Sequence, residues 1–154
     1  MTQGSIISEQ DKAQLKRTFR KDLKAQVLLK LFTYKTSSLL TIPGRDCPQC
    51  PQTQQLMEEL AGLSPKITLE TVDFYEEPKV AQEHGVTRIP AIVFESAGSS
   101  RLKFYGAPLG YETATLIEDI KTISRGVSPL SMDTRKKLRQ VNQDVHIQVF
   151  VTPT

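Results

Sequence analysis

The stretch GRDCPQCP, residues 44–51, contains both cysteines of this 154-residue chain, Cys47 and Cys50, with two residues between them. Thiols at this spacing can exchange electrons, bind a metal ion or close a small disulfide loop. Which of these applies depends on the secondary structure around the pair, because reactivity follows the local environment of the thiol. The flanking sequence therefore decides both the fold and the chemistry.

The segments on either side of the pair show helical and strand patterns. Ser8 is a suitable N-cap, and Leu15, Phe19 and Leu23 recur at every fourth position, which predicts a helix over residues 8–24. The same criteria predict further helices over residues 52–61, 76–84 and 111–125, and strands over residues 27–32, 67–74, 91–94 and 102–105.

This order of elements is typical of an α/β protein. Helices between the early strands favour parallel pairing, and a turn at residues 97–100 joins the last two strands as an antiparallel hairpin. We therefore predict a small mixed sheet flanked by helices. The cysteine pair falls between the first strand and the helix that follows it.

That position favours a reactive thiol. Cys47 lies at or just before the start of the helix, where free backbone N–H groups and the helix dipole stabilise an anion and lower the pKa of a thiol. Cys47 is thus the candidate nucleophile, and Cys50, one turn later, is the candidate resolving thiol. Pro51 disfavours helical geometry at Cys50, so we expect the regular helix to begin at residue 52.

Metal binding and a structural bridge are the alternatives. A zinc site usually needs four ligands, and the chain adds only His84 and His146 to the two cysteines, so a site within one chain is not expected. A zinc ion or iron–sulfur cluster shared between two chains would require a dimer. A structural disulfide that closes so short a loop adds little stability. Redox exchange is therefore the favoured hypothesis for the cysteine pair.

Composition excludes several other classes of protein. The apolar and charged fractions, 38% and 24%, are those of an ordinary globular domain. No apolar run approaches the length of a membrane helix and the N-terminus lacks a secretory signal, which predicts a cytoplasmic protein. The basic cluster at residues 135–139 has no aromatic residues interleaved, so nucleic-acid binding is not expected.

The cysteine pair followed by VDFYEEPKVAQEHGVTRIPAIVFE, residues 72–95, resembles the thioredoxin-fold proteins. The resemblance implies that the peptide bond between Ile89 and Pro90 is cis and lies against the cysteines. It also implies that Ile89 offers its backbone to an extended substrate, so that Ile89 and Pro90 form the substrate-binding edge beside Cys47.

Three further stretches narrow the resemblance: FYGAPLGYE at residue 104, IEDIKTISRG at residue 117 and DVHIQVFVTPT at residue 144. They are similar to the tandem, glutaredoxin-like protein disulfide oxidoreductases of archaea and thermophilic bacteria. The resemblance implies a thioredoxin-like domain over residues 1–125. It also implies that residues 126–154 form a linker and the first helix and strand of an incomplete second thioredoxin-like unit.

The patterns in the last segment agree with this division. They predict a second helix over residues 132–142 and a second strand over residues 145–150. An apolar strand without a partner at residues 145–151 should seek another chain, so we expect a homodimer formed through it.

The expected function is thiol–disulfide exchange between the cysteine pair and protein disulfides. No organic cofactor and no metal are needed, and a flavin-dependent reductase is the expected electron donor. The chain departs from thioredoxins in having no tryptophan, with Asp46 before the first cysteine. Lys30, the only ionisable residue of the first strand, is expected to point its ammonium group outward. The alternative is a redox-weak scaffold or partner-docking module of a larger tandem protein.

Overall fold

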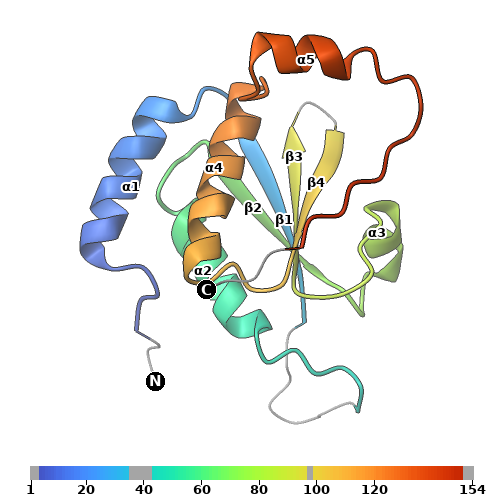
Figure 1. The fold of residues 1–154 in the computed structure, drawn as a ribbon. Coiled ribbons are helices and arrows are strands. Elements are labelled where there is room, and N and C mark those ends of the chain that lie inside the picture. The colour runs from blue at the N-terminus through green and yellow to red at the C-terminus, as the bar shows by residue number, and fades with distance from the viewer. Residues whose placement is uncertain (1–3, 35–42, 97–98, 151–154) are drawn as a thin grey trace.

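The computed structural model describes the backbone of residues 4–34, 43–96 and 99–150. The helices are α1 (Glu9–Asp22), α2 (Cys50–Ala61), α3 (Pro78–Glu83), α4 (Tyr111–Arg125) and α5 (Met132–Leu138), and the strands are β1 (Val27–Thr33), β2 (Ile67–Asp73), β3 (Ala91–Ser96) and β4 (Ser99–Tyr105). Their order along the chain is the predicted one (Figure 1). Part of the predicted turn at residues 97–100 lies outside the described residues.

The four strands form one mixed sheet in the order β2-β1-β3-β4. β1 pairs in parallel with β2, and β3 and β4 form the predicted antiparallel hairpin. β3 runs antiparallel to β1, although a helix precedes it, and this differs from the parallel pairing expected for the early strands. The reason is that α3 is only six residues long, so it does not carry the chain back along the full length of the sheet.

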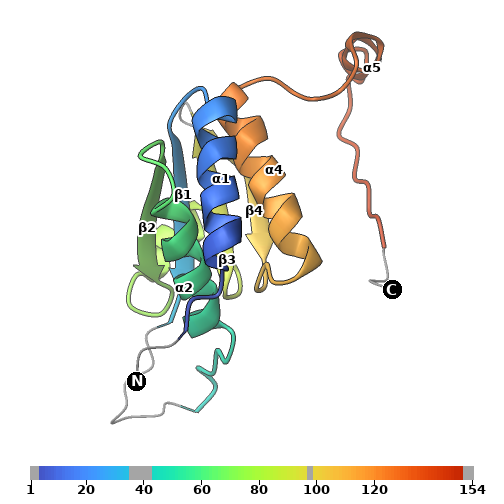
Figure 2. The same ribbon diagram turned by 90° about the vertical axis from the view of Figure 1, so that its left-hand side faces the viewer.

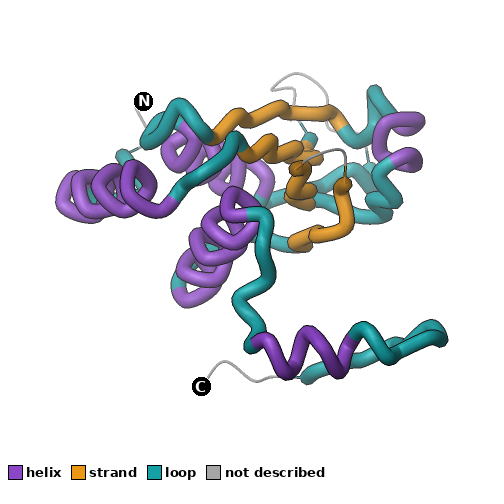
Figure 3. The backbone as a smooth tube through the Cα atoms, turned by 90° about the horizontal axis from the view of Figure 1, so that it is seen from above, coloured by secondary structure: helices purple, strands orange, loops and turns teal. Residues whose placement is uncertain are grey.

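The two faces of the sheet are covered unequally. Figures 2 and 3 show α1, α2 and α4 on one face, where the largest group of buried apolar side chains lies. Phe19 of α1, Leu56 of α2 and Leu116 of α4 are each at most 1% exposed in this core. On the other face, α3 and the chain that follows it enclose a smaller apolar cluster around Phe32 and Val93. Fold and layers are those predicted for an α/β protein.

The ends of the first two helices follow local chemistry. The Ser8 side chain accepts a hydrogen bond from the Asp11 backbone N–H and caps α1 as predicted. α2 begins at Cys50, two residues before the predicted start. Pro51 is tolerated there because it occupies the first turn, where a backbone N–H has no partner within the helix.

The N-terminal segment is attached to α2 through one carboxylate. Glu59 accepts hydrogen bonds from the backbone N–H groups of Ile6 and Ile7, at 2.9 and 3.0 Å. The Ser5 hydroxyl and the Gln55 amide donate to the same carboxylate, at 2.8 and 3.0 Å. Partial burial raises the pKa of Glu59, but these four bonds to its charged form outweigh that effect and lower the pKa from 4.5 to about 2.

Replacing Glu59 with Gln is expected to lower the free energy of unfolding by about 1–3 kcal/mol at pH 7, because the four donors lose a charged acceptor. The folded-state pKa of Glu59 lies below its unfolded value, so its contribution is complete above about pH 4.5 and is lost as the pH falls towards 2. Urea denaturation of both proteins at pH 7 and at pH 3 measures this. A difference between Glu59→Gln and the parent chain that grows on acidification would contradict the assignment.

The last described segment, residues 126–150, extends away from the sheet (Figures 1 and 2). α5 ends at Leu138, four residues before the predicted end, and residues 145–150 are extended without forming a strand, so the predicted second strand is wrong. A strand needs a neighbour to accept its hydrogen bonds, and within the described part of the sheet neither edge pairs with this segment. Its apolar side chains, among them Ile147 and Phe150, are 78% and 88% exposed.

Among the helices of the described residues, none combines the length and the apolar character needed to cross a membrane.

Candidate active site

The two cysteines are joined by a disulfide bond in the structure, with their Cα atoms 5.3 Å apart. Cys47 is 5% exposed and Cys50 is fully buried. Cys50 is the first residue of α2, and its backbone N–H donates to the Cys47 carbonyl at 3.1 Å, which closes a tight turn. Cys47 therefore stands just before the helix, as predicted, and is the more exposed residue of the pair.

The start of α2 favours a negative charge. Gln49 occupies the N-cap position, but its side chain makes no hydrogen bond to the helix. Its carbonyl accepts hydrogen bonds from the Thr53 backbone N–H and hydroxyl, at 2.9 and 2.8 Å. The Gln49 side chain therefore does not occupy the positive end of the helix dipole, where a thiolate formed on reduction of the disulfide is stabilised.

The segment before the cysteines is held by an aromatic group. The Arg45 guanidinium lies 4.7 Å from the centre of the Tyr75 ring. Tyr75 in turn makes edge-on contacts with the rings of Tyr34 and Phe74, at 5.3 and 5.2 Å between centroids. Sequence reasoning missed this group, although the adjacent aromatic residues 74 and 75 at the end of β2 were a visible signal for it.

Ile89 and Pro90 lie at the sheet end that leads to the cysteines. The peptide bond between them is cis, and Pro90 is buried. The next residue, Ala91, pairs with Phe32, close to the carboxyl end of β1 from which the chain runs towards Cys47. The structure thus brings both predicted pairs of site residues to one end of the sheet.

Residues 87–90, here named the docking segment, are fixed at both ends. The Gly85 carbonyl accepts hydrogen bonds from the Lys103 ammonium and the Tyr105 hydroxyl, both at 3.2 Å. The Pro90 carbonyl accepts one from the Gly106 N–H at 2.9 Å. Between these anchors, residues 87–89 make no backbone hydrogen bond with any other residue that the structure describes. Their backbone can therefore pair with an extended peptide.

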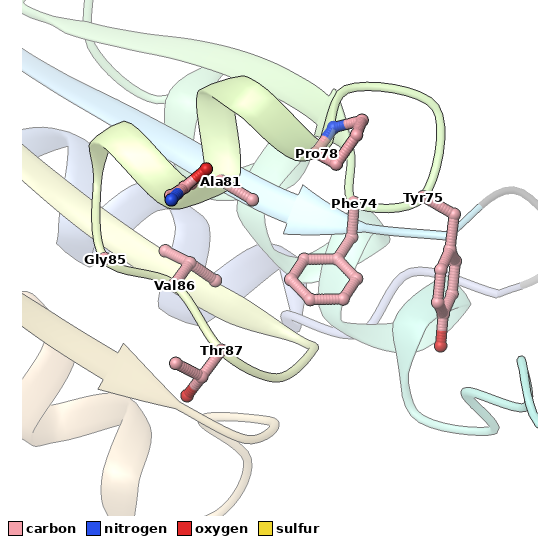
Figure 4. Close-up of a pocket in the computed structure, with 8 residues that line it drawn as sticks. Phe74, Tyr75, Pro78, Ala81, Gly85, Val86 and Thr87 are labelled. Carbon is pink, nitrogen blue, oxygen red and sulfur yellow. The ribbon is translucent and has the colours of Figure 1, made fainter.

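A cavity of about 330 Å³ lies beside α3, between the residues that follow β2 and the start of the docking segment (Figure 4). Its lining is mainly apolar and includes Phe74, Tyr75, Pro78, Ala81, Val86 and Thr87. The ring of Tyr75, over which the Arg45 guanidinium lies, is part of the lining. Thr87, the first residue of the docking segment, is also part of it. The cavity is therefore built by the end of β2, by α3 and by the chain that leads to the docking segment, which the sequence patterns did not indicate.

Lys30 does not point outward as expected. Its ammonium group lies 3.6 Å from the Glu70 carboxylate, 3.4 Å from the Glu95 carboxylate and 3.5 Å from the His84 ring nitrogen Nε2. The side chain is only 19% exposed. Carboxylates on both neighbouring strands hold the Lys30 ammonium group against the sheet. The charge is therefore paired although the side chain is largely shielded from water.

His84 connects this charged group to the end of α3. Its Nε2 atom lies 2.7 Å from the Glu95 carboxylate, and its Nδ1 atom lies 2.9 Å from the Val80 carbonyl. The ring also contacts Phe32, at 5.6 Å between centroids. Because α3 is short, these contacts help to fix it in front of the docking segment, which follows it in the sequence. His84 therefore belongs to the scaffold and is not grouped with the cysteines; within the described residues, no cluster of three metal-ligating side chains occurs.

Comparisons with known proteins agree with this geometry. The family model described as thioredoxin domain matches residues 39–118, just over half of the chain. A thioredoxin from Methanocaldococcus jannaschii is 33% identical over 76 residues, which cover 49% of this chain and 81% of that protein. The match and the bonded cysteine pair together support dithiol–disulfide exchange.

Two solved structures have a similar fold. The NTD_N/C domain of the alkylhydroperoxide reductase AhpF from Enterococcus faecalis aligns with a TM-score of 0.70 and 26% identity, over 86% of this chain and 59% of that one. A protein disulfide oxidoreductase from Aeropyrum pernix aligns with a TM-score of 0.72 and 23% identity, over 87% of this chain and 55% of that one. The chain thus spans little more than half the length of either structure.

Proposed function

The chain belongs to the thioredoxin domain family and has dithiol–disulfide oxidoreductase chemistry in its one cysteine pair, and from this premise we propose that Cys47 is the attacking thiolate and Cys50 the resolving thiol. The observation that carries the assignment is the difference in access. Cys47 is 5% exposed as a residue and Cys50 is fully buried, so Cys47 is the cysteine that we expect a substrate sulfur to reach first.

The exchange balances within the two sulfur pairs. In the reduced chain, the Cys47 thiolate attacks one sulfur of a substrate disulfide, and the other substrate sulfur leaves as a thiolate. Cys50, after losing its proton, then attacks the Cys47 sulfur and displaces the second substrate thiolate. Two electrons pass to the substrate, both of its thiolates take up protons, and the chain is left with the Cys47–Cys50 disulfide seen in the structure. Reverse operation would oxidise a protein dithiol.

The docking segment would hold the substrate during this exchange. An extended peptide can hydrogen-bond with the free backbone around Ile89, as an added strand does at a sheet edge. Pro90 closes the segment through its anchored carbonyl, and the adjacent cavity can accept one apolar side chain of the peptide. Protein disulfides in accessible, extended segments are therefore the proposed substrates.

Trapping of a mixed disulfide tests the proposal. Reduced Cys50→Ser protein, mixed with a protein that contains an accessible disulfide, should form a covalent complex that dithiothreitol releases, because no second thiol resolves it. Mass spectrometry should place the link at Cys47, and the Cys47→Ser protein should form no complex under the same conditions. A complex that forms equally well with Cys47→Ser would overturn the assignment of roles.

The electron donor is proposed to be a flavin-dependent reductase, in a reducing cytoplasm where the pair can be recycled. The 26% identity with the alkylhydroperoxide reductase domain supports a reductase partner of this kind. Reduction of the Cys47–Cys50 disulfide by such an enzyme would return the chain to its active form. A scaffold role remains the second candidate, since Cys47 is only 5% exposed.

Residues 126–154 are proposed to begin a second thioredoxin-like unit. The alternate apolar residues Val145, Ile147 and Val149, all exposed in the described segment, support this, because they need a covering surface. In a solution of this chain alone they would be covered by a second copy, which gives a homodimer. Light scattering over a range of concentrations tests the dimer, and a monomer throughout would count against it.

A further inference from the structure

Two arginines border the proposed substrate site in the same way. Arg45 stands two residues before Cys47, and Arg88 stands immediately before Ile89. The Arg45 guanidinium lies 4.7 Å from the centre of the Tyr75 ring, and the Arg88 guanidinium lies 4.6 Å from the centre of the Tyr105 ring. Each charge is thus held over an aromatic face, which leaves the edge of the guanidinium and its N–H donors available.

Both tyrosines are themselves held in place. Tyr75 is fixed by its edge-on contacts with two neighbouring rings, and the Tyr105 hydroxyl donates a hydrogen bond to the Gly85 carbonyl at 3.2 Å. The arginines therefore rest on positioned platforms and lose little side-chain freedom when a ligand binds.

Neither arginine forms an ion pair with a carboxylate in the parts of the chain that the structure describes. By contrast, Lys30, Lys121 and Arg125 each have at least one carboxylate within 4 Å. A planar guanidinium binds a carboxylate through two parallel hydrogen bonds, and such charge-assisted pairs are stronger than neutral ones. The two free guanidinium groups are therefore complementary to acidic side chains.

The lining of the apolar cavity includes one residue beside each arginine. Tyr75 lines the cavity, and the Arg45 guanidinium lies over its ring. Thr87 also lines the cavity, and Arg88 is the next residue in the sequence. Figure 4 shows the Phe74 ring between Tyr75 and Thr87. A peptide that lies along the docking segment would thus be close to an apolar pocket and to two positive charges next to residues of its lining.

We propose that Arg45 and Arg88 select protein disulfides that are flanked by aspartate or glutamate, with an apolar residue between the acidic positions entering the cavity. The proposal rests on the function proposed above, because it concerns the substrates of the same site. The proposed selection acts on substrate binding, through pairing of the two guanidinium groups with acidic side chains of the substrate. It is weakened by salt, because the pairs form at the surface.

Matched peptides test this selection. Each peptide contains one intramolecular disulfide and the same apolar residues, and the flanking positions are glutamate, glutamine or lysine. The reduced chain should react with the glutamate peptide about five- to twentyfold faster, by second-order rate constant, than with the glutamine peptide at low salt, and slowest with the lysine peptide. The preference should shrink to less than about twofold at 0.5 M salt.

Variants assign the effect to the two residues. Arg45→Gln and Arg88→Gln should each lower the ratio of the rate with the glutamate peptide to the rate with the glutamine peptide severalfold, whatever either change does to the rate with both peptides. Arg88→Lys should restore only part of the preference, since lysine lacks the planar fork. Arg20→Gln on α1 makes the same change in net charge at another exposed position and should leave the preference intact.

Uncharged hydroxyethyl disulfide distinguishes a failure of the proposed function from a failure of the proposed selection. If the parent chain reduces neither this compound nor any peptide, the proposed function fails. If it reduces them all but does not distinguish glutamate from glutamine, or if Arg45→Gln and Arg88→Gln keep the full preference, the selection by these arginines is wrong and the proposed function stands.

Discussion

Replacing Cys47 with serine is expected to slow reduction of protein disulfides by at least about 10³-fold. A hydroxyl group is not ionised at neutral pH and cannot form the mixed disulfide, so the first step of the exchange is lost. The folded structure should change little, because Cys47 lies outside α2 and the short loop that its disulfide closes contributes little stability. Insulin reduction, followed by turbidity with dithiothreitol as the electron source, measures the effect.

Cys50→Ser is the matched control for this experiment. It removes the same disulfide bond and makes the same change of sulfur to oxygen, but it keeps the proposed attacking thiol. Turnover should be low in both variants, whereas the initial covalent step should survive only with Cys50→Ser. An activity of Cys47→Ser within tenfold of the parent chain would contradict the assignment.

Replacing Phe19 with alanine is expected to lower the free energy of unfolding by about 3–5 kcal/mol. Phe19 is fully buried between α1 and the sheet, within the same cluster as Leu29 of β1 and Leu116 of α4. The change removes apolar surface from the core and leaves a cavity that rigid helices cannot close. Urea denaturation followed by circular dichroism measures the difference.

Phe150→Ala tests whether the tail lies outside the core. It is the same substitution on a ring that is 88% exposed in the described tail, so the free energy of unfolding should change by less than about 0.5 kcal/mol. If both variants lose the same stability, the tail packs into the core and the division of the chain near residue 125 is wrong. A loss under 1 kcal/mol for Phe19→Ala would place α1 outside the core.

Local patterns in the sequence predict most of the fold. The cap at Ser8, the apolar repeat of α1 and the strand pattern at residues 67–74 are properties of neighbouring residues, and the structure contains the cap, the helix and the strand. The site at the junction between β1 and α2 follows from the position of the cysteine pair in that order. The start of α2 was misplaced because Pro51 can either end a helix or occupy its first turn.

Contacts between distant residues account for what could not be predicted. Arg45 is separated from Tyr75 by 29 intervening residues of the sequence, and only the fold places one over the other. Lys30 pairs with carboxylates on two neighbouring strands, which depends on the register of the sheet. Residues 145–150 have a strand pattern but no strand beside them, and a pattern cannot supply the missing partner.

The reduction potential of the Cys47–Cys50 pair tests the central claim most directly. The protein is equilibrated with thiol–disulfide buffers of known potential, and free thiols are trapped with a mass tag and counted, with Cys50→Ser as the control for incomplete trapping. An exchange catalyst should give a value between about −180 and −270 mV, the range that extends from protein disulfide isomerase to thioredoxin. A value below about −300 mV is that of a structural disulfide and would contradict the proposed exchange.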